Sequence, residues 1–207
     1  MKKDYVLGIL FFSGLWGISE AVLGGALYKA DVPHASVILT IIGFVILSFA
    51  HVYFPQKGTA TLIAVCAMLY KFLNAPFFAC HLLGIALIGI CYDLFLSVFK
   101  IKNKSVCALT SCYLSYVLFA LMITYVFRYE HWLGAGFGKL LRYVGISGSL
   151  AALGCAMFVP LGFLLGERLK AKLSTPFKLQ LKLTTGGVSL VTVGLWIFGL
   201  AVFFLNF

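Results

Sequence analysis

The chain has 207 residues, of which 62% are hydrophobic and 11% are charged, and its formal net charge is +10. Soluble globular domains are about 45–50% apolar and about 25% charged, so this composition excludes an ordinary water-soluble domain. The lysines and arginines are divided among short loops instead of forming one basic patch, which argues against a nucleic-acid-binding protein.

Seven apolar segments follow one another along the chain. Each is close to or longer than the roughly 20 residues that a helix needs to cross a bilayer. They are residues 5–28, 35–54, 58–75, 77–99, 105–127, 144–166 and 184–206. The first is longer than the apolar region of a signal peptide and is interpreted as a retained helix. The pattern predicts an all-α, polytopic helical membrane protein.

The basic residues between these segments predict the orientation of the chain, because lysine and arginine are enriched in cytoplasmic loops. With the N-terminus inside, the cytoplasmic side holds Lys2, Lys3, Lys57, Lys100, Lys102, Lys104, Arg168, Lys170, Lys172, Lys178 and Lys182. The outer loops hold Lys29, Arg128, Lys139 and Arg142. We therefore expect an inner N-terminus and an outer C-terminus. Residues 1–172 would form a six-helix bundle that binds substrate, and residues 173–207 the end of a basic cytoplasmic linker and an additional seventh transmembrane helix.

Small residues recur every four positions in the first segment. Ser13, Gly17, Ala21 and Gly25 therefore lie along one stripe of a helix. Within a bilayer, helices associate largely through close backbone approach over small residues. The stripe predicts a docking face, either for another helix of this chain or for a partner protein.

Glu20 lies in the middle of the same segment. A carboxylate in a bilayer is costly unless it faces the protein interior and has a partner, so its default interpretation is functional. Lys71 in the third segment and His81 in the fourth are predicted at a similar depth in the outer half. Glu20 and Lys71 could form a structural salt bridge, or these groups could line an outward-facing cavity. The predicted substrate-binding set is Glu20, Lys71, His81, Trp16, Tyr70 and Asn74.

A second polar set lies deeper, with Asp93 and Tyr92 in the fourth segment and His51 near the inner end of the second. We expect a structural or interfacial role for Asp93 in preference to a catalytic one. The six cysteines form no CxxC motif and do not pair with histidine at metal-site spacing. They are interpreted as small apolar core residues, and neither a metal site nor a cofactor is expected.

The chain resembles the substrate-binding S components of energy-coupling factor (ECF) transporters. The resemblance rests on six compact helices with an inner N-terminus and on the small-residue stripe of the first helix. It also draws on the segments FPQKGTATLIAVCAMLYK and VPLGFLLGERL, and it covers about residues 5–172. The seventh segment is additional to the pattern of this family.

The resemblance implies a vitamin- or micronutrient-binding protein of the cytoplasmic membrane, without enzymatic activity. Such a protein captures its ligand at the outer face and docks through its first helix to a transmembrane coupling subunit with two cytosolic ATPases. The N-terminal His-containing motif of the cobalt and nickel members is absent from this chain. A metal substrate is therefore not predicted.

Two other functions are compatible with the sequence. The first is a self-contained secondary carrier in which Glu20 or Asp93 takes up and releases a proton, although no inverted repeat is detected. The second is a seven-span intramembrane zinc hydrolase, although the histidines form no HxxxH motif.

Overall fold

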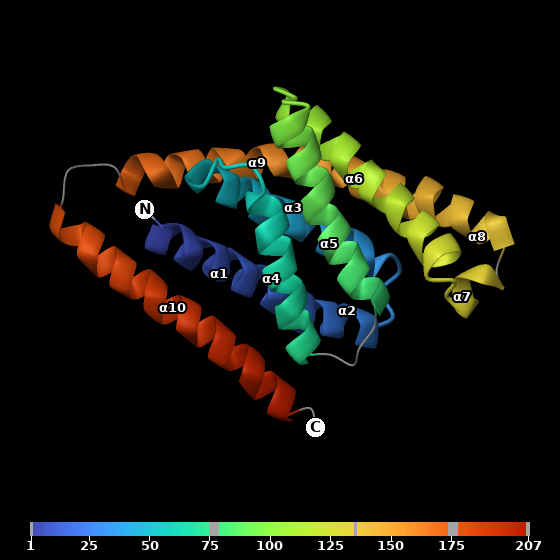
Figure 1. Cartoon of the computed structure of the whole chain (residues 1–207), viewed down its shortest axis with the longest axis horizontal. Coiled ribbons are helices and arrows are strands. Elements are labelled where there is room, and N and C mark those ends of the chain that lie inside the picture. The colour runs from blue at the N-terminus through green and yellow to red at the C-terminus, as the bar shows by residue number, and fades with distance from the viewer. Residues whose placement is uncertain (1, 75–78, 135, 174–177, 206–207) are drawn as a thin grey trace.

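The computed structural model describes residues 2–74, 79–134, 136–173 and 178–205, and these residues form helices and short connections without β-strands (Figure 1). The first helical stretch comprises α1 (Lys2–Ile18), the π-helical turn η1 (Ser19–Leu23) and α2 (Gly24–Lys29). Next come α3 (Ala35–Tyr53), α4 (Thr59–Asn74), α5 (Ala79–Asp93) with η2 (Leu94–Val98), and α6 (Lys104–Leu121) with η3 (Met122–Val126). The chain continues through α7 (Glu130–Leu133), α8 (Gly136–Arg142), η4 (Tyr143–Gly148), α9 (Ser149–Leu173) and α10 (Lys178–Leu205).

The long helices confirm the predicted class, a membrane-embedded helical protein. Five helical stretches are long and apolar enough to cross a membrane: Lys3–Lys29, Ala35–Tyr53, Cys80–Val98, Lys104–Val126 and Gly136–Lys172. Within the residues searched, α4 and α10 contribute the shorter apolar stretches Thr59–Leu69 and Gly186–Ala201. Consecutive long helices run in alternate directions, and α10 runs in the same direction as α1 (Figure 1). The seven spans and the side that each helix end faces remain predictions.

The outer surface of the bundle carries the large apolar side chains expected of a protein surrounded by lipid. Large apolar side chains point outward, as shown by Met157 at 70% exposed and Leu190 at 77% exposed. The interior holds apolar side chains such as Phe44 together with hydroxyl-bearing residues such as Ser13 and Ser48, all of them fully buried. Because lipid tails solvate apolar side chains, such helices associate through close packing and hydrogen bonds. The burial pattern follows this rule.

Close packing of α3 on α9 forms one side of the bundle and depends on glycines. A Cβ atom added at Gly162 would collide with the Ser48 hydroxyl and would lie 2.9 Å from the carbonyl oxygen of Val45. At Gly166 it would lie 3.0 Å from Cγ2 of Val52. These two glycines let the backbones of α3 and α9 approach each other closely.

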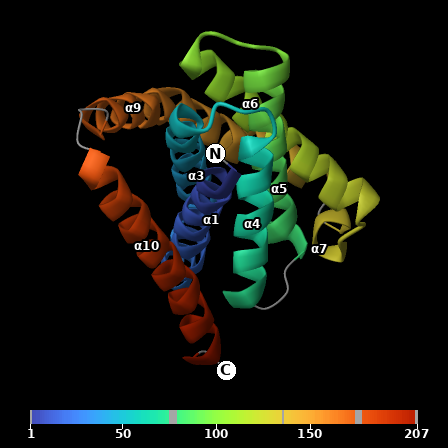
Figure 2. The same ribbon diagram turned by 60° about the vertical axis from the view of Figure 1, so that its left-hand side comes forward.

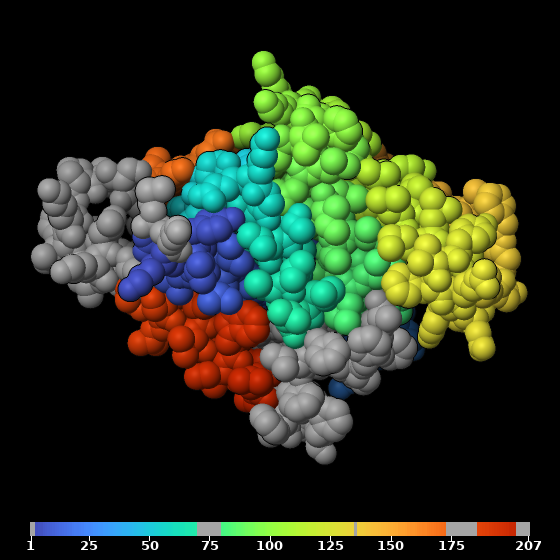
Figure 3. All heavy atoms as spheres, in the orientation of Figure 1, coloured from blue at the N-terminus to red at the C-terminus, as the bar shows by residue number. Residues whose placement is uncertain are grey.

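Helix α10 lies against α1 and α4 at the edge of the bundle (Figures 2 and 3). The indole N–H of Trp196 donates to the backbone carbonyl of Leu10 at 3.0 Å. The same indole nitrogen would lie 3.2 Å from a Cβ atom at Gly14. The contact between α1 and α10 therefore combines an interhelical hydrogen bond with a close approach over glycine.

Asp93, at the end of α5, is buried against the start of α4. Its Oδ2 atom accepts hydrogen bonds from the backbone N–H of Thr61 at 2.6 Å and from the Thr61 hydroxyl at 2.7 Å. The first N–H groups of a helix lack partners within the helix, and a carboxylate at this end also interacts favourably with the helix dipole. These contacts support the structural interpretation of Asp93.

Two segments differ from the sequence-based prediction. Residues 128–143 lie between the fifth and sixth predicted segments, but they contain α7 and α8, and α8 continues through η4 into α9. The basic linker after the sixth span is also largely helical, because α9 extends to Leu173 and α10 begins at Lys178. Leucine, lysine, arginine and alanine have high helix propensity, so a charged segment of this composition continues a helix beyond the apolar span.

Candidate functional site

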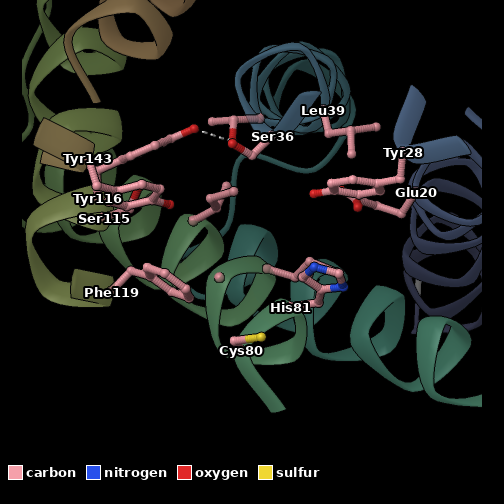
Figure 4. A pocket seen from close by; sticks show the side chains of 14 residues that line it. Glu20, Tyr28, Ser36, Leu39, Cys80, His81, Ser115, Tyr116, Phe119 and Tyr143 are labelled. Carbon is pink, nitrogen blue, oxygen red and sulfur yellow. Dashed lines mark hydrogen bonds between the residues drawn. The ribbon is translucent and has the colours of Figure 1, made fainter. Parts of the chain in front are cut away.

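A partly open cavity of about 90 Å³ lies between the helices (Figure 4). Tyr28 and Ser36, on either side of the connection from α2 to α3, both line it. Side chains from the first helical stretch, α3, α5, α6 and η4 line it. The lining residues are Glu20, Tyr28, Ser36, Leu39, Thr40, Cys80, His81, Gly84, Ile85, Ile88, Ser115, Tyr116, Phe119 and Tyr143. Segments that are far apart in the sequence thus form the cavity together.

Glu20 supplies an acidic group at one side of the cavity. It lies in the π-helical turn η1 and is 8% exposed. The indole N–H of Trp16, one turn earlier, donates to Glu20 Oε1 at 3.4 Å. Trp16 is fully buried, and its ring lies over Gly43 of α3, where an added Cβ would come within 2.8 Å of the ring. Packing between α1 and α3 therefore holds the donor that orients the carboxylate.

His81 lies beside Glu20 and Tyr28 on the same side of the cavity (Figure 4). Its ring stacks on that of Tyr28, with a centroid separation of 5.7 Å and an interplanar angle of 17°. Tyr28 comes from α2 and His81 from the first turn of α5. The stack therefore joins the end of the first helical stretch to the start of α5 at the cavity.

Aromatic rings from α6 and η4 form the opposite wall. Tyr116 and Tyr143 stack with centroids 5.2 Å apart, and Phe119 contacts Tyr143 at 5.6 Å. Behind this wall, Trp132 of α7 meets Tyr143 edge to face at 5.0 Å. A hydrogen bond of 3.2 Å joins the hydroxyls of Tyr116 and Thr40 (dashed in Figure 4). The wall is fixed by ring packing and tied to α3.

Two cavity residues lie in π-helical turns inside longer helices. Glu20 belongs to η1, between α1 and α2, and Tyr143 begins η4, between α8 and α9. A π-turn inserts an extra residue into the helix and re-aims the side chains near it, and such turns occur frequently at functional sites. A hydrogen bond of 2.9 Å between His34 Nδ1 and the Ser147 hydroxyl links η4 to the start of α3. Both irregular turns therefore contribute a side chain to the cavity.

Comparison with protein-family models, with curated proteins and with solved structures finds no match to the chain. The site is therefore interpreted from its own geometry and chemistry.

The structure brings two of the predicted site residues, Glu20 and His81, into one cavity. Trp16 contacts the Glu20 carboxylate from behind and is absent from the described lining. Tyr70, Lys71 and Asn74 were also predicted to belong to the site, but their side chains lie outside those that the structure describes. Their contribution to the cavity, including the expected pairing of Lys71 with Glu20, remains a prediction.

The predicted docking stripe is divided between covered and open positions. Ser13 and Gly17 are buried. Ala21 and Gly25 are half-buried, and a Cβ atom at Gly25 would meet no other atom within 4 Å. Within this structure, a second protein could reach the stripe at its Gly25 end.

Sequence reasoning did not find the aromatic wall or the hydroxyl groups of the cavity. Ser115, Tyr116 and Phe119 share a face of α6, but helical spacing alone does not show whether that face meets lipid or the interior of the bundle. Tyr28 and Tyr143 lie at the ends of the predicted segments 5–28 and 144–166, where tyrosine is also enriched for its affinity for the membrane interface. From the sequence, these tyrosines could therefore not be distinguished from residues of the membrane interface.

The lining can bind a small ligand through one carboxylate, an imidazole, several hydroxyls and ring faces. A few convergent polar groups on an apolar and aromatic surface are the usual composition of a small-molecule site. Among the described residues, no group of three or more His, Cys, Asp or Glu side chains is placed to hold a metal ion.

Proposed function

We propose that this protein is the membrane-embedded substrate-binding subunit of an ECF-type uptake transporter for a small micronutrient or vitamin. The observation that carries the proposal is the cavity inside the helical bundle, lined by Glu20, His81 and the tyrosines. Polar and ionisable groups within membrane helices are rare and mark substrate or ion pathways. Their convergence from separate helices supports a ligand site.

The depth of the cavity supports capture from one side of the membrane. Its residues come from the end of the first helical stretch, the start of α3 and α5, and the last turns of α6. These ends share one side of the bundle, opposite the N-terminus of α1 (Figure 1). With the predicted inner N-terminus, the cavity opens toward the outer face of the cytoplasmic membrane.

An energy-coupling partner is part of the proposal. The sequence contains no Walker motif, so ATP hydrolysis would be supplied by another protein. A transmembrane coupling subunit would approach the first helix where small residues remain accessible, at Ala21 and Gly25. Two cytosolic ATPases would act through that subunit.

Mass spectrometry of small molecules released from the purified full-length protein tests the ligand site. We expect one organic compound in stoichiometric amount from the wild-type protein and a reduced amount from the folded Glu20→Ala variant. A variant that keeps the full amount of the compound would contradict the assignment of the cavity. Co-purification of an ATPase pair with the tagged protein tests the transporter assignment.

A proton-coupled carrier is the second candidate, because Glu20 is a buried carboxylate within the cavity. Such a carrier would move its substrate without a partner. Reconstitution of the purified protein alone into liposomes separates the two functions. Substrate accumulation driven only by a proton gradient would favour the carrier.

A further inference from the structure

We infer that the segment formed by α7 and α8 binds the headgroups of anionic phospholipids at one surface of the membrane. The segment comprises residues 128–134 and 136–142, in the connection between α6 and α9. It lies at one end of the bundle (Figure 1) and projects there in the space-filling view, where it is yellow (Figure 3). Helix length, exposure and charge support this role independently of what the cavity binds.

The length of one helical stretch places α8 at the membrane surface. Gly136–Lys172 runs for 37 residues through α8, η4 and α9, which is about 55 Å at about 1.5 Å per residue. The hydrocarbon core is about 30 Å thick, and even a tilt of about 40° leaves the stretch about 42 Å long across the membrane. Charged residues lie toward both of its ends, with Arg142 near one end and Arg168 near the other. Both ends therefore extend into the headgroup layers, and α8 lies in one of these layers.

The segment exposes large apolar side chains at this depth. Phe137 and Leu141 lie four residues apart on α8 and are 63% and 54% exposed, whereas Leu140 is buried. Leu133, at the end of α7, is also exposed. Helices that lie in the membrane interface bury such an apolar face at the boundary between headgroups and acyl chains. Lipid acyl chains therefore fit the outer face of α8.

The charges of the segment favour an anionic headgroup. Arg128 precedes α7 and Arg142 ends α8, and both are exposed. Among the described residues, neither arginine has a hydrogen bond or an ion pair. Lys139 is a further cation, and Glu130 is the only carboxylate in this part of the sequence. Because a guanidinium group binds phosphate through two parallel hydrogen bonds, a lipid phosphate can bind either arginine without breaking an existing contact.

Contacts with the bundle hold the segment in place. The ring of Trp132 on α7 meets Tyr143 edge to face at 5.0 Å and Phe119 at 5.8 Å. The Lys139 ammonium lies 5.3 Å from the centroid of the Trp132 ring and donates to the His131 carbonyl at 3.1 Å, which ties α8 to α7. The segment is therefore a preformed surface, and it is attached to the aromatic wall of the cavity.

Hydrogen–deuterium exchange measured along the chain tests the inference. Purified full-length protein is placed in nanodiscs of phosphatidylcholine that contain increasing fractions of phosphatidylglycerol. We expect peptides that cover residues 128–142 to exchange more slowly as the fraction of phosphatidylglycerol rises. An unchanged exchange rate in these peptides, or a slowing confined to other parts of the chain, would overturn the inference.

Charge variants identify the groups responsible. Arg142→Gln should raise the fraction of phosphatidylglycerol needed for half of the effect about fivefold, and the double variant Arg128→Gln/Arg142→Gln should abolish the slowing. Lys29→Gln removes one charge from an exposed position at the end of α2 and should leave the response unchanged. A double variant that responds like the wild type would overturn the inference.

Inorganic phosphate separates a lipid from a soluble anion as the occupant. Added to the protein in phosphatidylcholine nanodiscs at constant ionic strength, it should leave the exchange of residues 128–142 unchanged. A slowing equal to that caused by phosphatidylglycerol would overturn the lipid assignment and indicate a site for a soluble anion. Failure of these tests leaves the proposed ligand site in place, because neither Arg128 nor Arg142 lines the cavity.

Discussion

The indole of Trp16 donates to the carboxylate of Glu20 within a single helical stretch, at 3.4 Å. Trp16 is fully buried against Gly43 of α3, whereas Glu20 lines the cavity. One residue is thus anchored in the packing between helices, and the other presents its charge to the cavity. The contact links the stability of the bundle to the chemistry of the site.

Replacement of Trp16 by phenylalanine should lower stability more than Glu20→Gln does. The phenylalanine leaves Glu20 without this donor and leaves unfilled space over Gly43, at an expected cost of about 1–3 kcal/mol. Glu20→Gln retains an acceptor for the indole. Thermal unfolding of the two variants in detergent provides the comparison, and a Trp16→Phe variant that is no less stable than Glu20→Gln would contradict the expectation.

Asp93→Asn should destabilise the protein by about 1–3 kcal/mol, because the hydrogen bonds to the start of α4 lose their charge. Asp31→Asn, in the exposed connection after α2, is the matched control and should be neutral. The free energy of unfolding of both variants is measured under the same conditions. A neutral Asp93→Asn variant would refute the capping role.

Gly162→Ala should weaken the packing of α9 on α3. The added methyl group meets the Ser48 hydroxyl and the Val45 carbonyl, and such overpacking costs about 1–3 kcal/mol. Gly145→Ala, in the helical turn that precedes α9, places its methyl in open space and should not destabilise the protein. Unfolding midpoints of the two variants distinguish close helix contact from a general effect of glycine replacement.

Gly14→Leu should loosen the contact between α1 and α10. The larger side chain would displace the Trp196 indole, which bonds to Leu10 O. We expect a loss of about 1–3 kcal/mol in the free energy of unfolding. Gly194→Leu, on α10 itself, faces open space and is the control. If both variants unfold like the wild type, α10 does not depend on this contact.

Gly25→Leu tests partner docking through the first helix. A Cβ atom at this position meets nothing within 4 Å, so the fold should tolerate the change. We expect the variant to bind the cavity ligand normally but to lose its coupling subunit in a co-purification experiment. Retention of the partner by a folded Gly25→Leu protein would move the docking surface elsewhere.

Several features could be predicted from sequence because they depend on local composition. The bilayer requires continuous apolar segments, so hydropathy marked helices that begin and end within a few residues of those in the structure, as for residues 35–54 and α3. Helical rise relates position to depth, which placed Glu20 and His81 at one level. A structural or interfacial role was predicted for Asp93, but its partner Thr61 was not foreseen.

The sequence by itself determined that the protein is a bundle of membrane helices with a buried carboxylate in the first of them. Only the tertiary structure decided which rings face that carboxylate, because hydropathy does not show whether Tyr116 or Tyr143 points to lipid or to the interior. It also decided that α10 lies over Gly14, and that Ser13 and Gly17 are buried. Depth follows from position along one helix, whereas the cavity depends on the rotation and packing of several helices together.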